Sequence, residues 1–319
     1  MSKKKLFLAA DSGGSKTVWT LLNGDGEIIF KCHTQGVGAV KEGVLPVLET
    51  VKEAFGKLEK FGTLQSIYFS LGGPNIGEVE SALQSCWTNV QICVEREASG
   101  NAMLHAAKFF KCSAVVMCGT GSVAIGDTLN GRKFAGGWGP IYGDGGSGGG
   151  MGSDALKMFL NSIDSKKNIG GLSQIFSELI LGLDITQFAD RMELKNRAVN
   201  MSRRKLAALV PEIYHLAEMG DKTALSLFEH SAKDIAELAL NVSDNACDFE
   251  ILLCGGFFAG KPILLKMCET EFSKISCAVL KYIPEFSPIV AAQIAVLEKN
   301  NIKVTDEVFM RILKNQKEI

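Results

Sequence analysis

The chain is 319 residues long and 46% hydrophobic, which is enough apolar sequence for two domains with sizeable cores. Its formal net charge of −1 at pH 7 offers no basic surface to nucleic acid or to an anionic membrane, and no apolar run reaches the roughly 18 residues of a membrane span. We therefore expect a cytoplasmic protein whose partners are small molecules.

The chain opens with a predicted β-hairpin whose turn is rich in glycine and hydroxyl groups. Apolar strands are expected at 6–9 and 18–22, and because the turn between them opens no helix, it is neither a P-loop nor a Rossmann turn. Its glycines let backbone amides approach an anion, and Asp11 is placed to hold a cation, so the turn suits a Mg-nucleotide or is an ordinary hairpin. The candidate phosphate-binding residues are Gly13, Gly14, Ser15, Lys16 and Thr17.

Predicted strands and helices alternate through the rest of the first third. A strand at 27–32 completes a three-stranded meander, after which helical periodicity appears. The elements expected next are a helix at 41–60, a strand at 65–71, a helix at 76–86, a strand at 90–95 and a helix at 98–110.

The second half repeats this opening. Strands are expected at 114–118 and 122–127, and the turn between them supplies the candidate phosphate-binding residues Gly119, Thr120, Gly121 and Ser122. Two such hairpins on the two sides of a cleft would clamp a polyphosphate. Helices follow at 147–163, 172–181, 194–218 and 221–244, and then a buried strand at 249–254. The pair Gly255-Gly256 after that strand would admit a flat ligand face.

Four segments together resemble the N-acetylglucosamine kinase family, within the sugar kinase, actin and Hsp70 superfamily, along nearly the whole chain. Residues 10–17 resemble its first phosphate motif, 118–122 its second and 253–256 its adenosine motif. The most specific match is 136–147, which resembles the sugar-site loop G-G-W-G-x-x-x-G-D-E-G-S.

The resemblance implies an α/β fold of two actin-like, ribonuclease H-like domains with a central cleft for nucleotide and sugar. We expect these domains at 1–112 and 113–286, the second with a helical insertion, and a helical segment at 287–319 that returns to the first domain. The implied cofactor is Mg-ATP. The implied reaction is phosphorylation of an amino sugar, with N-acetylglucosamine as the expected substrate. The resemblance also implies a homodimer.

The same resemblance assigns roles to individual residues. Asp11 would hold Mg²⁺ through water, while the hairpin amides offset charge on the β- and γ-phosphates. Glu97 stands where the family has an aspartate as general base, and Glu95 is the second candidate. The expected sugar contacts are Gly38, Gly72, Thr120, Gly137, Trp138, Gly139 and Asp144.

Three departures from the family pattern put the substrate in question. Glu97 is one methylene longer than aspartate, so it acts as base from a retreated backbone or is only a carboxylate at a helix start. Residues 34–40 lack the family's asparagine, which leaves room for N-acetylmuramic acid with its carboxylate beside Lys41, or is a plain loop. Gly145 replaces the family's glutamate, and we expect the glycine-rich run 145–150 to be mobile on closure.

Two other functions are compatible with these motifs. The same branch resembles ATP-driven activators of acyl-CoA reductases and dehydratases, which carry a cluster held by cysteines of two subunits. Cys86 with Cys93, or Cys112 with Cys118, are the candidate ligands, although nine scattered cysteines without a C-x-x-C pair indicate reduced core thiols. The altered base would also suit a catalytically inactive sugar-binding sensor.

Overall fold

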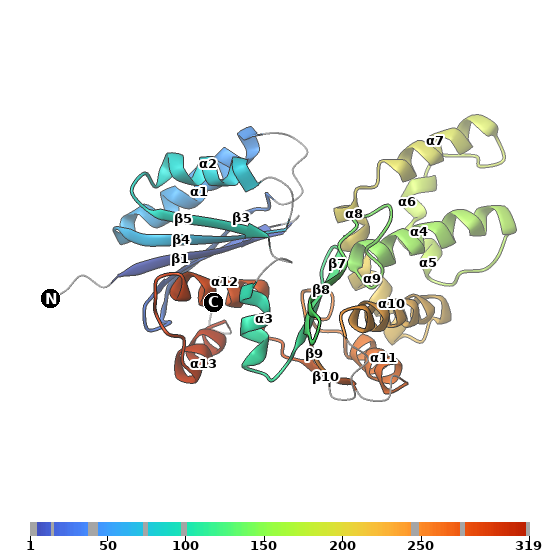
Figure 1. Cartoon of the computed structure of the whole chain (residues 1–319). Coiled ribbons are helices and arrows are strands. Elements are labelled where there is room, and N and C mark those ends of the chain that lie inside the picture. Colours follow the sequence, from blue (N-terminus) through green and yellow to red (C-terminus); the bar gives the residue numbers. More distant parts are fainter. Residues whose placement is uncertain are drawn as a thin grey trace. The chain divides into compact units, whose positions relative to one another are not determined.

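Each half of the chain is organised around one five-stranded sheet (Figure 1). The computed structural model describes residues 5–13, 16–37, 44–72, 76–96, 101–243, 249–274 and 278–316. The chain divides into two compact units, Met1–Val115 with Tyr282–Ile319, and Val116–Lys281. The carboxyl-terminal helices therefore belong to the same unit as the first sheet.

The sheet of the first unit has the strand order β3-β2-β1-β4-β5. Its strands are β1 Leu6–Ser12, β2 Lys16–Asn23, β3 Ile28–Gln35, β4 Leu64–Leu71 and β5 Gln91–Arg96. The first three form the expected antiparallel meander, and β4 and β5 continue the sheet in parallel with β1. Strand β1 is apolar and buried along nearly its whole length, as expected for a strand with both faces covered.

Helices cover both faces of this sheet (Figure 1). They are α1 Val44–Leu58 with the 3₁₀ turn η1 Glu59–Phe61, α2 Ile76–Cys86, α3 Asn101–Lys108, α12 Pro288–Glu298 and α13 Asp306–Lys314. Helices α1 and α2 pack on one face, where Trp19 is fully buried in the core. Helix α12 packs against β1 and β4 on the other face and is buried on all sides, because α3 and α13 cover its outer surface.

The sheet of the second unit has the order β10-β9-β6-β7-β8. Its strands are β6 Ala114–Cys118, β7 Ser122–Thr128, β8 Gly131–Gly136, β9 Phe249–Cys254 and β10 Ala278–Tyr282. Counted from the opposite edge, this is the strand order of the first sheet. The internal repeat predicted from the two glycine-rich hairpins is thereby confirmed at the level of topology.

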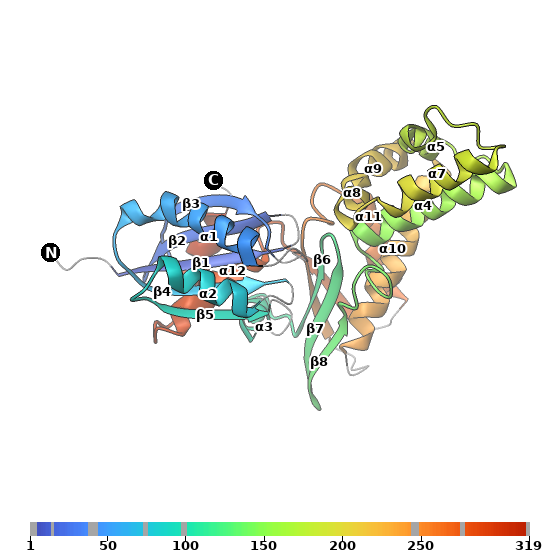
Figure 2. The same cartoon turned by 90° about the horizontal axis from the view of Figure 1, so that it is seen from above.

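A helical segment lies between β8 and β9 (Figure 2). Its helices are α4 Gly148–Ser165, α5 Leu172–Ile175, α6 Ser177–Ile180, α7 Phe188–Val199, α8 Arg203–Ala208, α9 Val210–Glu218 and α10 Lys222–Asn241, and α11 Pro262–Ser273 follows β9. Helix α10 packs on β7 and β8, and α11 packs on α10. No helix among the described ranges is long and apolar enough to cross a membrane.

The single helix predicted at 194–218 is wrong. The chain forms α7, α8 and α9 there, because two local signals interrupt an apolar periodicity that runs through all three. Ser202 accepts a hydrogen bond from the Lys205 amide and starts α8 as its N-cap. Pro211 stands in the first turn of α9, a position that proline tolerates, whereas a helix interior excludes it. The helix predicted at 172–181 is likewise two short helices, α5 and α6.

Candidate functional site

The first hairpin is held together by buried hydroxyl groups at its base. Thr17 Oγ1 donates to the Gln35 carbonyl at 2.9 Å and lies 2.8 Å from Ser12 Oγ, which accepts from the Val37 amide at 3.0 Å. Ser12 and Thr17 are both fully buried. The Gly13 amide donates to the Lys16 carbonyl at 3.1 Å and closes the turn. The Thr17 hydroxyl is therefore engaged inside the sheet in this structure, while the side chain of Lys16 is exposed.

Asp11 lies on β1 near the turn, between Val18 of β2 and Ser70 of β4. Its Oδ1 atom is buried and has no hydrogen-bond partner in the described part of the chain. Burial raises the pKa of this carboxyl from 3.8 to about 7, and the Ser70 hydrogen bond and the Lys16 charge only partly oppose that shift. A buried carboxylate oxygen without a donor is a site where a cation would be stabilising.

The second hairpin leaves a different set of groups free. The Gly119 amide donates to the Gly121 carbonyl at 2.8 Å, and the carbonyls of Gly119 and Thr120 accept from the first amides of α4, Gly148 and Gly149, at 2.8 and 3.0 Å. Helix α4 thus orients the hairpin by binding its carbonyls. The amides of Thr120 and Gly121 and the Thr120 hydroxyl make no hydrogen bond to a described residue, so they are available to a phosphate.

Ser122 connects this hairpin to the loop that was predicted to bind sugar. Its hydroxyl donates to the Gly145 carbonyl at 2.6 Å, and its carbonyl accepts from the Gly137 amide at 2.9 Å. In the same loop the Trp138 side chain is 77% exposed, and Gly139 has a φ of 85°, a conformation that favours glycine. The loop therefore presents an aromatic face from a backbone fixed at Ser122.

Asp144 is the buried carboxylate of this loop, with 3% of its side chain exposed and a φ of 68°. The Ser147 hydroxyl donates to the Asp144 carbonyl at 2.6 Å and fixes this unusual backbone conformation. Burial raises the pKa of the Asp144 carboxyl, and Arg203, whose Nη2 lies 2.5 Å from Oδ2, opposes the shift together with the Ser122 amide. Neither carboxylate oxygen receives a hydrogen bond of good geometry within the described ranges.

Two charged residues at this loop were missed by sequence reasoning. Arg203 comes from α8, and Asp234 of α10 accepts a hydrogen bond from the Gly146 amide at 3.1 Å. A β-carbon at Gly145 would lie 2.9 Å from the Asp234 carboxylate, so Gly145 leaves room for that side chain. The sequence signal that could have indicated Asp234 is the glycine at position 145 in place of the family's glutamate, because a glycine there leaves space for a carboxylate from another element.

The glycine-rich run 145–150 has a packing role in this structure, and its expected mobility on closure stays a prediction. A β-carbon at Gly149 would overlap the Thr120 carbonyl, and one at Gly150 would overlap the Asp144 carbonyl. Ser147 caps α4 by accepting a hydrogen bond from the Gly150 amide at 3.1 Å. These glycines allow α4 to start in direct contact with both the hairpin and the loop.

The two glycines that follow β9 differ in their surroundings. Gly255 has a φ of 108°, and a β-carbon there would overlap the Cys118 carbonyl, while the Phe257 amide donates to that same carbonyl at 3.0 Å. At Gly256 a β-carbon would meet no described residue within 4 Å apart from its two chain neighbours. Gly255 therefore packs β9 against the start of the second hairpin, and Gly256 is the position open to a ligand.

Glu95, the second candidate base, is held in an ion pair on β5. Its Oε1 lies 2.7 Å from Lys299 Nζ, and its Oε2 accepts from the Tyr68 hydroxyl at 2.9 Å. The pKa of Glu95 is lowered, because hydrogen bonds from Lys299 and Tyr68 outweigh burial, the largest single influence. Such a carboxylate is a weak proton acceptor.

The remaining predicted site residues have simple placements. The Gly72 amide donates to the Ser12 carbonyl at 2.8 Å at the end of β4. Gly14, Ser15, Gly38 and Glu97 lie outside the described residues, as does Lys41. No group of three or more metal-binding side chains occurs within the part of the chain that the structure describes.

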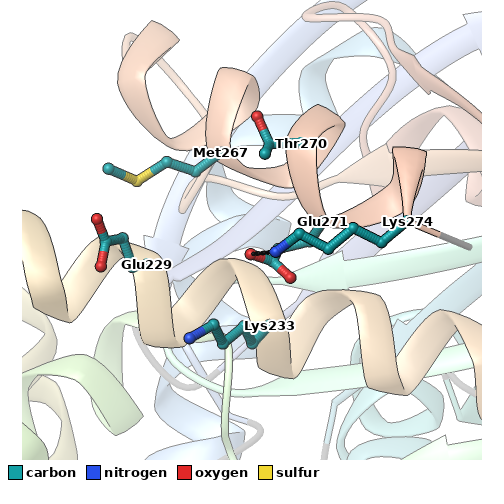
Figure 3. Close-up of a pocket in the computed structure, with 6 residues that line it drawn as sticks. All are labelled: Glu229, Lys233, Met267, Thr270, Glu271 and Lys274. Atoms are coloured by element: carbon teal, nitrogen blue, oxygen red, sulfur yellow. Dashed lines mark hydrogen bonds and ion pairs between the residues drawn. The ribbon is translucent and has the colours of Figure 1, made fainter.

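A separate hollow of about 310 Å³ lies between α10 and α11 (Figure 3). Its lining residues are Glu229, Lys233, Met267, Thr270, Glu271 and Lys274. Its acidic and basic side chains balance, and Lys274 pairs with Glu271 at 2.7 Å. None of the predicted site residues lines this hollow, so it is distinct from the two hairpins and the 136–147 loop.

Comparison with solved structures identifies the fold. A provisionally named N-acetylglucosamine kinase from Chromobacterium violaceum matches with a TM-score of 0.71 at 18% identity, covering 92% of this chain and 99% of that one. The (R)-2-hydroxyglutaryl-CoA dehydratase component A of Acidaminococcus fermentans gives a TM-score of 0.51 at 14% identity, with coverages of 93% and 99%. The predicted actin-like α/β fold is thereby confirmed.

Sequence comparison finds more similar relatives. The N-acetyl-D-glucosamine kinase of Dictyostelium discoideum is 26% identical over 288 residues, which are 82% of this chain and 88% of the relative. The N-acetylmuramic acid/N-acetylglucosamine kinase of Clostridium acetobutylicum is 26% identical over 241 residues, with coverages of 72% and 77%. Residues 10–294 match the model of one family, and because this match spans most of the chain, the protein belongs to the BadF/BadG/BcrA/BcrD ATPase family.

Proposed function

We propose that this protein is an ATP-dependent kinase that transfers a phosphoryl group to a hydroxyl of an amino sugar, with N-acetylglucosamine as the preferred substrate. The observation that carries the proposal is the position of Ser122, which belongs to the second hairpin and hydrogen-bonds both Gly137 and Gly145 of the 136–147 loop. A phosphate-binding turn and a sugar-binding loop would thus be built as one piece. The names of the Dictyostelium and Clostridium relatives support the same substrate class.

Mg²⁺ fits at Asp11, because its buried Oδ1 has no donor among the described residues. When bound, the ion would neutralise charge on the β- and γ-phosphates of ATP. In this proposal Asp11 holds the ion through water, and the exposed ammonium of Lys16 adds positive charge beside it. The proposed phosphate-binding residues of this hairpin are Gly13, Gly14, Ser15, Lys16 and Thr17, and the buried Thr17 hydroxyl, which donates to the Gln35 carbonyl, would fix the base of the turn.

The second hairpin would bind phosphate through its free donors. The amides of Thr120 and Gly121 and the Thr120 hydroxyl are unpartnered among the described residues, whereas Gly119 and Ser122 would fix the turn. Gly256 has open space for the flat face of the adenine base.

Glu97 is the proposed general base, on the family resemblance at that position. The surroundings of Glu95 favour this assignment, because Lys299 and Tyr68 already engage both of its carboxylate oxygens. A base must accept the proton of the attacking hydroxyl within hydrogen-bond reach, so a carboxylate bound by other donors is poorly suited.

The sugar would be bound by the loop and by positions near the two hairpins. Trp138 offers an exposed ring to the apolar face of the sugar, and Asp144 offers a carboxylate to its hydroxyls. The other proposed contacts are Gly38, Gly72, Thr120, Gly137 and Gly139. N-acetylmuramic acid is a proposed second substrate with its lactyl carboxylate near Lys41, and the name of the Clostridium relative supports it.

The activator function is the second candidate, since a dehydratase component shares the fold. Burial argues against one of its two cysteine pairs. Cys112 and Cys118 are 2% and 0% exposed, and burial raises the pKa of the Cys118 thiol, so neither presents a thiolate to a cluster shared between subunits. Cys86 and Cys93 are partly exposed and stay as candidate ligands.

A coupled assay of ADP release across glucosamine, N-acetylglucosamine, N-acetylmannosamine and N-acetylmuramic acid tests the proposal. We expect Mg-dependent turnover that requires the sugar, highest with N-acetylglucosamine. ADP release that no sugar stimulates, with iron-dependent absorbance near about 400 nm in anaerobically purified protein, would favour the activator. Sugar binding without turnover would favour the sensor. Light scattering checks the proposed homodimer, which would have twice the 34.3 kDa mass of the chain.

A further inference from the structure

Arg203 reaches the site because the helical segment breaks before it. Ser202 accepts from the Lys205 amide at 3.2 Å, and Arg203 is the first residue of α8. Helix α7 ends at Val199, so α8 starts as a separate helix at Arg203. Arg203 therefore enters the second unit's site from a helix that carries no motif of its own.

The guanidinium of Arg203 lies directly against the second hairpin. A β-carbon at Gly121 would overlap its Nη2 atom and would lie 2.6 Å from Asp144 Oδ1, and a β-carbon at Gly149 would lie 3.0 Å from the Cγ of Arg203. Gly121 thus makes room for both members of the Arg203–Asp144 ion pair, and Gly149 makes room for the stem of Arg203 as well as for the Thr120 carbonyl. The φ of Gly121 is not in the left-handed region, so space, and not backbone conformation, accounts for glycine there.

The same guanidinium is the cation that faces Asp144. Nη2 lies 2.5 Å from Oδ2 of a carboxylate that is 3% exposed. The other charged side chain that contacts this loop is Asp234 of α10, whose carboxylate accepts a hydrogen bond from the Gly146 amide. A buried carboxylate with one cation beside it loses its charge or its orientation when that cation is removed.

We propose that Arg203 is a positioning residue that keeps the Asp144 carboxylate charged and aimed at the sugar, and that its passage over Gly121 couples this carboxylate to the phosphate hairpin. The inference rests on the proposed function, because it assumes that Asp144 contacts the sugar. It adds a residue from the helical segment to the site and gives Gly121 a second role.

The test measures sugar affinity by titration calorimetry, without nucleotide, between pH 6 and pH 8.5. We compare the wild type with Arg203→Ala, Arg203→Lys and Gly121→Ala, and use Arg204→Ala as the matched control because Arg204 is the exposed neighbour on the same helix. Arg203→Ala should weaken N-acetylglucosamine binding by about 10- to 100-fold at pH 7, the range for a hydrogen bond to a charged group.

The pH profile separates positioning from a general structural role. In Arg203→Ala the Asp144 carboxyl should hold its proton to higher pH, so affinity should recover as the pH rises, whereas the wild-type affinity should change less over the same range, because Arg203 opposes the effect of burial on the pKa of this carboxyl. Arg203→Lys keeps a positive charge and should bind weakly with a profile like that of the wild type. Gly121→Ala should also weaken sugar binding, because its β-carbon would crowd both the Arg203 guanidinium and Asp144 Oδ1.

Several results would overturn the inference. Wild-type affinity in folded Arg203→Ala would show that Arg203 does not position Asp144. Equal pH profiles in Arg203→Ala and Arg203→Lys would show the same. If Arg203→Ala does not fold, Arg203→Gln, which removes the charge but keeps most of the length of the side chain, carries the same comparison with Arg203→Lys. If the wild type binds none of the four sugars, the proposed function fails together with the inference, whereas normal wild-type binding with unaffected variants refutes the inference alone.

Discussion

Replacing Asp11 with asparagine should stabilise the first unit at alkaline pH and abolish turnover. Burial raises the pKa of this carboxyl from 3.8 to about 7 against the opposing effects of Ser70 and Lys16. Because the folded chain binds this proton more tightly than the unfolded chain, the contribution to stability is full below the ordinary pKa and is lost as the pH rises through about 7. The side-chain amide of asparagine does not titrate in this pH range, so the variant does not lose this stability.

The size of the effect follows from the shift. Roughly three pKa units at about 1.4 kcal/mol each correspond to about 4 kcal/mol. At pH 5 only about 1.5 kcal/mol of this has been lost, and by pH 8 nearly all of it has. The free energy of unfolding of Asp11→Asn, relative to the wild type, should therefore increase by about 2–3 kcal/mol from pH 5 to pH 8.

The three tryptophans allow the first unit to be observed alone. Trp19 and Trp87 are buried in it, and Trp138 belongs to the second unit. Urea unfolding in a Trp138→Phe background, followed by tryptophan emission in Mg-free buffer, thus reports the unit that contains Asp11. Asp25→Asn is the matched control, because Asp25 is exposed in the same unit, and its effect should be equal at both pH values.

Magnesium provides a second readout of the same carboxylate. Mg²⁺ at pH 8 should stabilise the wild type and leave Asp11→Asn unchanged, because an ion that binds only the folded chain stabilises it. An equal stability gap between variant and wild type at pH 5 and pH 8 would refute the assigned burial effect. Wild-type turnover in Asp11→Asn would remove Asp11 from the mechanism.

Three further predictions concern the proposed base and sugar loop. Glu97→Gln should lower kcat by about 10²–10⁴-fold and leave sugar affinity intact, and Glu97→Asp should slow turnover on a retreated backbone but not on a family-like one. Full activity of Glu97→Gln in the coupled assay would show that Glu97 is not the general base and is only a carboxylate at a helix start. Glu95→Gln should retain kcat within about twofold, since Glu95 is paired with Lys299; a larger loss would reopen its candidacy. Amino sugars should change tryptophan emission in the wild type but not in Trp138→Phe, because Trp138 is 77% exposed; a response that persists in the variant would place the sugar elsewhere.

The repeat of two hairpins could be predicted because its signals are local. A strand, a glycine-rich turn and a returning strand occupy about fifteen consecutive residues, and the alternation of apolar side chains sets their pairing. The structure pairs β1 with β2 and β7 with β8 as antiparallel neighbours. The same reasoning failed over 194–218, because apolar periodicity continued through breaks that depend on Ser202 and Pro211.

The charges around Asp144 could not be predicted, because they depend on contacts between distant parts of the chain. Asp234 is 88 residues from the Gly146 amide that it binds, and Arg203 is also far along the chain from Asp144. Neither residue has a sequence pattern that distinguishes it from an exposed helix charge. The glycines that accommodate these side chains were visible, but a sequence reports only that a glycine is present and not which neighbour requires the space.

The two hairpins occupy equivalent positions in the repeated sheets, yet they offer opposite chemistry. The first hairpin engages its Ser12 and Thr17 hydroxyls internally and offers the unpartnered carboxylate oxygen of Asp11. The second binds its carbonyls to α4, and the donors of Thr120 and Gly121 have no partner within the described part of the chain. A carboxylate suits the cation of a Mg-nucleotide, whereas amides and a hydroxyl suit its phosphates. In the proposed reaction the first hairpin would therefore hold the cation and the second would bind phosphate, so Asp11→Asn should change the dependence on Mg²⁺, which substitutions in the second hairpin should leave unchanged.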